Sequence, residues 1–153
     1  RKVADTWGDK PFTAGLTYNS HALACATALA VIDVYEQDDL IERTRKMGKV
    51  MAEHHARLAA RHPSVGRTRS LGLFGIIELV RDRETYEPMA PYNGSSDEMK
   101  AIGAYLKEHG LFTFLRFNMI HTNPPLTISE EELAEGFDII DGALDIADEA
   151  VRA

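Results

Sequence analysis

The sequence predicts an α+β fold in which a small antiparallel sheet carries helices on one face. Helical and strand-like stretches follow one another in the order helix, helix, strand, strand, helix, strand, strand, helix. The connections within each strand pair are short, which favours antiparallel pairing. The helices after the first carry apolar residues at three- and four-residue spacing, so each has one face that requires a core.

Two helices are expected in the first part of the chain. Residues 1–18 are expected to be irregular, because Pro11 and Gly15 interrupt them. The helix at 20–35 is apolar nearly all round, so it needs cover on several sides. The next helix is expected at 39–61. Its apolar face is Leu40, Thr44, Met47, Met51, His55 and Leu58.

Strand pairs and two further helices complete the order. The strands are expected at 65–70 and 73–81, around Gly72, and at 111–116 and 119–122.

Capping patterns mark the starts of the last two helices. After a long loop at 82–95, Ser95 and Glu98 form one predicted capping box, and Ser129 and Glu132 form another. The apolar face of the last helix is Leu133, Phe137, Ile140, Leu144, Ala147 and Val151.

Composition limits the classes of partner. The 153 residues are 44% hydrophobic and 27% charged, and the formal net charge of −7 argues against nucleic acid and anionic membranes as partners. No apolar run reaches the ~18 residues of a membrane-spanning helix. The single cysteine, Cys25, cannot form an internal disulfide, so we expect a reducing, cytoplasmic compartment.

The segment from Gly15 to Ala26, GLTYNSHALACA, is a glycine turn with hydroxyl groups that leads directly into an alanine-rich helix. Hydroxyl groups and free backbone N–H groups at a helix start suit an anion such as a phosphate. The same residues also serve as ordinary helix caps, so local chemistry leaves both interpretations open.

Three segments in the same order resemble the class III (omega-type) aminotransferases. They are the Gly15–Ala26 segment, the stretch VGRTRSLGLFGIIELV at 65–80, and the motif PPLTI at 124–128, which precedes Ser129 and three glutamates. Ala22 stands where the family usually has proline. The resemblance extends over nearly the whole chain and implies a pyridoxal 5'-phosphate enzyme of fold type I that acts as a homodimer.

The resemblance also implies an active-site lysine that holds the cofactor as a Schiff base, upstream of Gly15. None of the six lysines stands in the family's context; they are Lys2, Lys10, Lys46, Lys49, Lys100 and Lys107. We therefore expect a carboxy-terminal portion without a catalytic residue of its own. Residues 1–37 would be a remnant of the large domain, with the phosphate-binding turn and an interface helix, and residues 38–153 the small α+β domain.

The resemblance assigns binding roles to four residues. Thr17 would donate to the phosphate of the partner subunit's cofactor, with Tyr18 beside it, either against the cofactor or as an interface aromatic. Arg116 would clamp the carboxylate of a keto acid, because a guanidinium matches carboxylate geometry, and the alternative is a surface or ion-paired arginine. Many members carry this arginine where the chain has Phe114, and ornithine-type members carry one where it has His121, a second candidate for the substrate pocket.

The implied reaction moves an amino group from an amine or omega-amino acid to a keto acid. Alternatives on the same scaffold are an aminomutase, a racemase or a decarboxylase, and an alternative of another class is a non-catalytic α+β interaction module. We expect the chain alone to be inactive for lack of the lysine. No metal site is expected, since His54 and His55 have no third ligand at suitable spacing.

Overall fold

The computed structural model describes residues 2–11, 15 and 17–151, which form two compact units, Arg1–Asp39 and Leu40–Ala153. We describe each unit by itself. Leu16, within the predicted phosphate-binding turn, lies outside the described residues. No described helix is long and apolar enough to cross a membrane.

The first unit contains two helices, α1 (Lys2–Asp5) and α2 (Ala22–Gln37). The short helix α1 lies in the stretch predicted to be irregular. Helix α2 begins two residues later than predicted, because Ser20 has a positive φ of 57° that a helix does not admit. None of its residues is buried, and Leu23 is 71% exposed, so its apolar surface lacks the cover that the sequence calls for.

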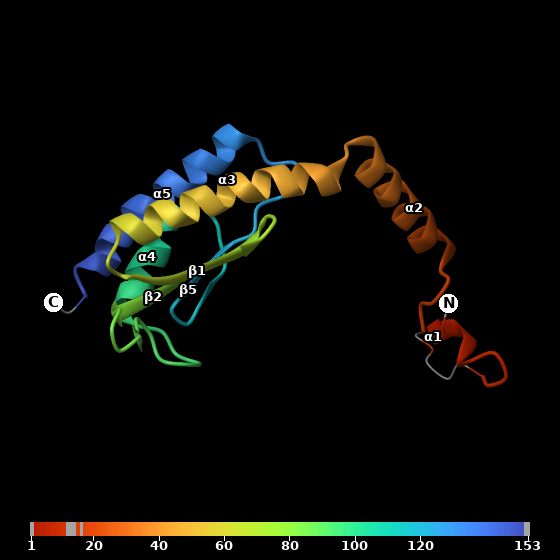
Figure 1. Cartoon of the computed structure of the whole chain (residues 1–153), viewed down its shortest axis with the longest axis horizontal. Coiled ribbons are helices and arrows are strands. Elements are labelled where there is room, and N and C mark those ends of the chain that lie inside the picture. Colours follow the sequence, from red (N-terminus) through yellow and green to blue (C-terminus); the bar gives the residue numbers. More distant parts are fainter. Residues whose placement is uncertain (1, 12–14, 16, 152–153) are drawn as a thin grey trace. The chain divides into compact units, whose positions relative to one another are not determined.

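The second unit holds a five-stranded antiparallel sheet and three helices (Figure 1). The strands are β1 (Val65–Leu71), β2 (Phe74–Asp82), β3 (Glu87–Pro88), β4 (Leu115–Arg116) and β5 (Met119–Thr122). The main order is β1-β2-β5-β4, and β3 pairs with the far end of β2. The helices are α3 (Leu40–Arg61), α4 (Asp97–Glu108) and α5 (Glu130–Asp148).

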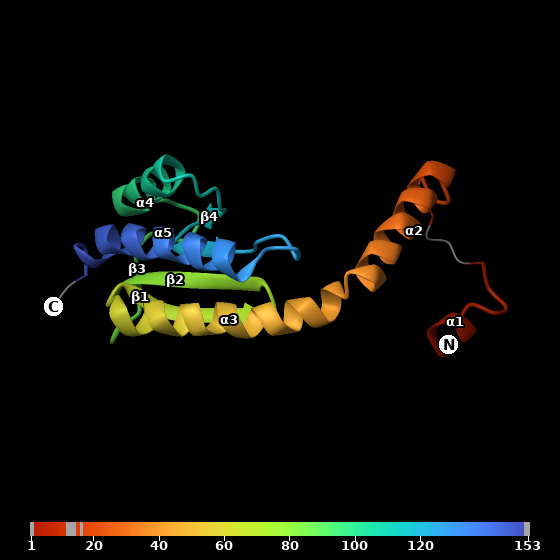
Figure 2. The same cartoon turned by 90° about the horizontal axis from the view of Figure 1, so that it is seen from above.

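The helices lie on one face of the sheet, as predicted. Figures 1 and 2 show α3 and α5 side by side along the same side of β1 and β2. The core between sheet and helices includes Ile77 of β2, Ile120 of β5 and Phe137 of α5, all buried. Strand side chains alternate between the two faces, so every second residue of β2 and β5 points away from these helices.

Helix α3 approaches the β1–β2 turn closely through two glycines. A Cβ on Gly48 would lie 2.6 Å from the Cα of Gly72, and Gly72 has a positive φ of 57°. A larger residue at Gly48 would therefore push the helix off the hairpin, and Gly72 suits the left-handed turn that joins the strands.

Three details differ from the sequence prediction. The strand predicted at 111–116 pairs only at Leu115 and Arg116, and the long loop contains β3. The capping box predicted for α4 is wrong, because Ser96 rather than Ser95 caps the helix by accepting from the Met99 N–H. Glu98 instead accepts a 2.8 Å hydrogen bond from Arg81 of β2, which lowers the pKa of Glu98 to about 2.

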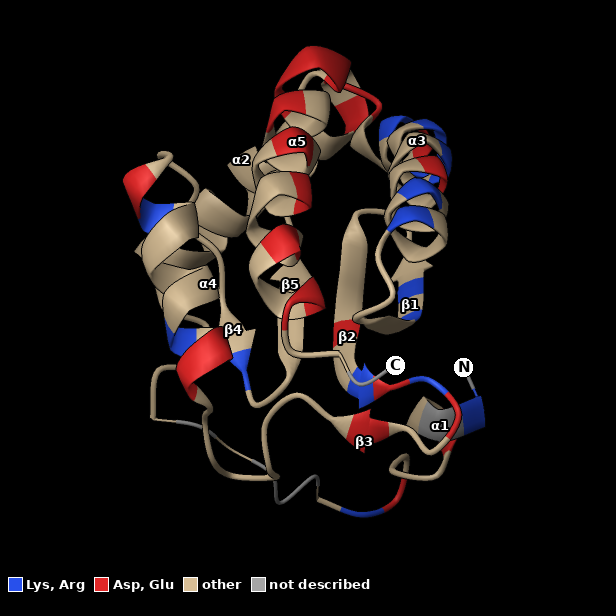
Figure 3. Ribbon diagram, turned by 90° about the vertical axis from the view of Figure 1, so that its left-hand side faces the viewer, with Lys and Arg blue, Asp and Glu red and all other residues tan. Residues whose placement is uncertain are grey.

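Charge also organises the contact between the parallel helices α3 and α5. Figure 3 shows acidic residues along α5 and basic residues along α3. Arg57 donates to Asp138 at 2.8 Å, and one turn further along Arg61 donates to Asp141. These partly exposed pairs add little energy individually, but they agree with the register of the two helices. The predicted capping box of Ser129 and Glu132 is confirmed at the start of α5.

Candidate functional site

The sheet face opposite the helices collects the predicted substrate residues. Arg116 pairs with Met119 across β4 and β5, and His121 lies two residues beyond Met119 on the same face. The intervening Ile120 and the following Thr122 are buried toward the helices. Phe114 extends this face, since its ring lies 5.0 Å from the His121 ring. The structure thus places Arg116, Phe114 and His121 on one face.

The turn that carries Arg116 is a two-residue hairpin loop, Phe117 and Asn118. Asn118 is buried and fixes the loop to β2. Its side-chain amide donates to the backbone carbonyl of Leu79 at 2.7 Å, and the backbone N–H of Leu79 donates to the backbone carbonyl of Asn118 at 2.8 Å. This reciprocal pair holds the end of β4 against the middle of the sheet.

Arg116 is exposed and lies over the ring of Phe117, with the guanidinium carbon 5.0 Å from the ring centroid. Among the described residues, no acidic group forms an ion pair with it. A guanidinium with free edges in this position can receive a carboxylate with two parallel hydrogen bonds.

His121 lines a pocket of about 240 Å³ between the end of β5 and the start of α5. The polar side chains around it include Thr113, Asn123 and Glu132, and Phe137 forms part of the apolar wall. The Nε2 atom of His121 is buried without a partner in the described part of the chain. The α5 residues of its wall put this pocket on the helix side of β5, whereas the side chains of His121 and Arg116 belong to the opposite face, and Arg116 is not among the lining residues. The pocket therefore does not join the two predicted substrate residues.

Thr17 and Tyr18 belong to the first unit and lie in the turn before α2, where both are exposed. His21 is the N-cap residue of α2, and its side chain makes no capping hydrogen bond. The first turn of α2 holds no acidic residue. The first backbone N–H groups of α2 therefore have no side-chain acceptor at the cap. This arrangement fits a phosphate, which the exposed Thr17 hydroxyl can also bind.

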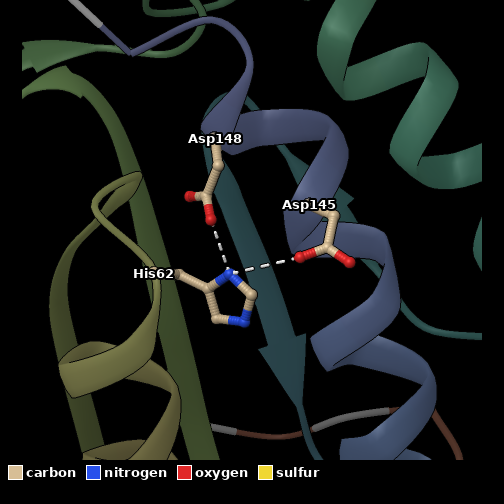
Figure 4. A group of neighbouring side chains, drawn as sticks. All are labelled: His62, Asp145 and Asp148. Atoms are coloured by element: carbon tan, nitrogen blue, oxygen red, sulfur yellow. Dashed lines mark hydrogen bonds and ion pairs between the residues drawn. The ribbon is translucent and has the colours of Figure 1, made fainter. Parts of the chain in front are cut away.

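A second polar cluster ties the end of α3 to α5 (Figure 4). The buried His62 places Nδ1 2.7 Å from a carboxylate oxygen of Asp148 and 3.9 Å from one of Asp145. Its Nε2 lies 2.9 Å from an oxygen of Asp141. His62, Asp145 and Asp148 are close enough to share an ion, but both ring nitrogens of His62 already have carboxylate partners. We interpret the cluster as a clamp between the helices.

A third histidine lies inside the core. His55 of α3 is 2% exposed, and its Nε2 lies 3.0 Å from the Thr122 hydroxyl of β5. Burial, with a smaller contribution from His54, lowers the pKa of His55 to about 4. A neutral ring of this kind supports the strand that carries His121 without facing the open side of the sheet.

Comparison with known proteins identifies the class. The family model "Aminotransferase class-III" matches residues 1–144. The chain is 34% identical over 137 residues to the probable 4-aminobutyrate aminotransferase of Bacillus subtilis (strain 168), covering 88% of the chain and 30% of that protein. It is 33% identical over 135 residues to a leucine/methionine racemase of Thermococcus litoralis, covering 88% and 29%.

Among solved structures, the taurine:2-oxoglutarate aminotransferase from Bifidobacterium kashiwanohense, in complex with PLP and glutamate, matches with a TM-score of 0.88 at 34% identity. That match covers 97% of this chain and 33% of the other. The fold is that of the fold-type-I transaminases. The chain belongs to the class III aminotransferase family, whose cofactor is pyridoxal 5'-phosphate. It spans about 30% of the length of the relatives it matches.

The contacts that surround Arg116 were not predictable from the sequence. Phe117 carries a positive φ of 56°, a conformation that an aromatic side chain gives no reason to expect. Asn118 was detectable as a turn residue, but its hydrogen bonds to Leu79 depend on a strand 39 residues away. His62 follows the predicted end of α3 and gives no local sign of its partners on α5.

Proposed function

We propose that the whole protein is a pyridoxal-phosphate-dependent aminotransferase that moves an amino group from an amine or omega-amino acid to a keto acid. The observation that supports this most strongly is the match to a transaminase that holds both PLP and glutamate and covers 97% of this chain. The exposed Arg116, which has no acidic partner among the described residues, supplies the group that a keto acid requires.

Thr17 binds the phosphate of the cofactor in this proposal. A charge-assisted hydrogen bond from its hydroxyl suits a dianion, and the uncapped start of α2 adds backbone donors. Tyr18 lies beside it and contacts either the cofactor or the partner subunit. When bound, the cofactor serves as an electron sink for the amino-acid carbanion.

Arg116 orients the keto acid in this proposal. Its fork of N–H donors binds the carboxylate with two hydrogen bonds and so fixes the direction of the adjacent carbonyl. His121 lines the neighbouring part of the substrate site, where its buried Nε2 can exchange a hydrogen bond with a polar substrate group. The lysine that moves protons in this chemistry is not one of the six in this chain.

The first unit would belong to the large domain and to the dimer interface. The domain boundary proposed from the sequence lies between residues 37 and 38, and the compact units divide after Asp39. Helix α2 exposes an apolar surface over 16 residues, which suits a helix that packs within a homodimer. The 153-residue chain alone would be inactive, since it lacks the lysine.

A racemase is the second candidate, because the leucine/methionine racemase of Thermococcus litoralis is 33% identical over 88% of the chain. The two activities differ in one requirement. A transaminase needs a keto acid to accept the amino group, whereas a racemase inverts an amino acid without an acceptor.

The test uses the whole enzyme loaded with pyridoxal phosphate. Incubation with an amine or omega-amino acid and either pyruvate or 2-oxoglutarate should form alanine or glutamate, and omission of the keto acid should abolish turnover. Inversion of an L-amino acid without any keto acid would instead identify a racemase. Absence of both reactions across amine, omega-amino acid and amino acid donors would overturn the proposal.

A further inference from the structure

The loop that follows Arg116 has an unusual backbone. In the two-residue loop between β4 and β5, Phe117 has a φ of 56°, whereas Asn118 is not among the residues with positive φ. A positive φ at the first loop position alone is the pattern of a type II′ turn, where glycine is favoured. A bulky side chain in the left-handed region is strained, and such strain is found where function requires a particular placement.

With this backbone conformation, the Phe117 ring lies beneath Arg116. The guanidinium carbon lies 5.0 Å from the ring centroid, within the range of a cation–π contact. The other neighbour of this ring is Tyr92, from the loop before α4, at 4.9 Å between centroids and 51° between planes. The ring of Tyr92 thus supports the ring of Phe117 from another side, and the hydrogen bond from Asn118 fixes the loop to β2.

The cation–π contact leaves the hydrogen-bonding capacity of the guanidinium unused. Its N–H donors lie along the edges of the planar group, and no hydrogen bond or ion pair occupies them within the described part of the chain. A carboxylate binds in the plane through those edges, so ring and carboxylate do not compete. A long, exposed side chain would otherwise lose rotational freedom when it binds, and a side chain held in advance loses less.

We propose that Phe117 is a positioning residue that, supported by Tyr92, holds the Arg116 guanidinium in the orientation that receives the substrate carboxylate. The inference rests on the proposed role of Arg116 as the carboxylate clamp. It assigns to the β4–β5 loop a part in the recognition of keto acids as against carbonyl compounds without a carboxylate.

The chain offers a matched control for this stack. Arg67 of β1 lies over the ring of Tyr86 at 5.4 Å, and Tyr86 also has a positive φ, of 59°. This second pair has the same kind of cation–π contact and a similar positive φ, with one further hydrogen bond from the Tyr86 hydroxyl to the Gly66 carbonyl at 3.4 Å. Neither of its residues belongs to the proposed site. Tyr86→Leu therefore reports what the loss of any such pair does to the fold.

The experiment compares Phe117→Leu, Phe117→Tyr, Tyr86→Leu and Arg116→Lys in the whole, cofactor-loaded enzyme. Leucine keeps the bulk and the strained backbone but removes the ring, whereas tyrosine keeps the ring. The acceptors are pyruvate and butanal, an aldehyde without a carboxylate. Phe117→Leu should raise KM for pyruvate about two- to fivefold, the range for a cation–π contact at an exposed site, with kcat and the KM for butanal unchanged.

Phe117→Tyr should restore the pyruvate KM, and Tyr86→Leu should leave it at the wild-type value. An unchanged pyruvate KM in Phe117→Leu, together with a raised one in Arg116→Lys, would overturn the positioning role and leave the clamp intact. An unchanged pyruvate KM in Arg116→Lys would instead overturn the clamp itself. Equal increases for pyruvate and butanal in Phe117→Leu would assign the residue a structural role only and so contradict the inference.

Discussion

His62, just after α3, is joined to Asp148, at the end of α5, by a 2.7 Å contact between Nδ1 and a carboxylate oxygen. The other oxygen of Asp148 accepts hydrogen bonds from both the N–H and the hydroxyl of Ser64, at 3.0 and 2.5 Å. One carboxylate therefore fixes the segment that leads from α3 into β1. Because β1 begins at Val65, this link helps to set where the sheet starts beneath the two helices.

We expect Asp148→Ala to lower the free energy of unfolding by about 1.5–3 kcal/mol, the usual effect of losing a hydrogen bond to a charged group. The buried His62 would be left without this partner. Urea denaturation of the 153-residue chain measures the change. Asp145→Ala is the control, since its carboxylate is 3.9 Å from His62 and its side chain is 64% exposed, and it should cost at most about 0.5 kcal/mol. Equal losses in both variants would contradict the clamp.

Burial of His55 should make stability depend on pH. Its pKa falls from 6.5 to about 4 on folding, so the unfolded chain binds the proton first as pH decreases. As far as His55 is concerned, the free energy of unfolding is highest above pH 6.5. It falls as the pH drops from 6.5 to 4, and below pH 4 it no longer changes. The shift corresponds to at most about 3.5 kcal/mol. His55→Gln should flatten the dependence of unfolding free energy on pH in this window, and an unchanged slope would show that other groups cause it.

The fold was predictable where local pattern and tertiary structure agree. The last helix has both a capping box at Ser129 and an apolar stripe, and either would identify it. Gly72 marks the turn between β1 and β2 because that turn requires a positive φ. The start of α4 was not predictable, because Ser95 and Ser96 are adjacent candidates and Glu98, which would decide between them, binds Arg81 instead.

For the candidate site, strand alternation predicts which residues share a face of the sheet, and the sequence predicts little beyond that. Alternation places Arg116 and Phe114 on one face whatever the pairing partner, and the structure agrees. The apolar run before Leu115 favours a longer strand than the structure has, since sequence does not reveal which backbone groups find partners. The stack of Arg116 on Phe117 depends on a strained φ that no residue preference indicates.

The absence of a suitable lysine predicts the behaviour of the chain toward the cofactor. We expect the 153-residue chain, mixed with pyridoxal phosphate and reduced with borohydride, to show no stoichiometric label at any single lysine. The described lysines are on the surface or, like Lys100, bonded to a neighbouring carboxylate. Peptide mapping by mass spectrometry measures the distribution. A single fully labelled lysine would mean that the chain carries its own cofactor attachment site.

Thr17 allows the sharpest test of the first unit. In the whole enzyme, Thr17→Ala should weaken cofactor affinity by roughly 1.5–3 kcal/mol, the usual contribution of a hydrogen bond to a charged group. Thr17→Ser keeps the hydroxyl and should retain affinity.

Thr27→Ala is the matched control, because the Thr27 hydroxyl bonds to the Leu23 carbonyl within α2 at 2.9 Å and faces no proposed ligand. If Thr17 serves the partner subunit, a mixed dimer of Thr17→Ala with a variant that lacks the cofactor lysine should keep wild-type affinity at its one intact cofactor site, because that site faces the unsubstituted Thr17 of the lysine variant. Equal affinity of Thr17→Ala and wild type, measured by cofactor titration, would remove Thr17 from the phosphate site.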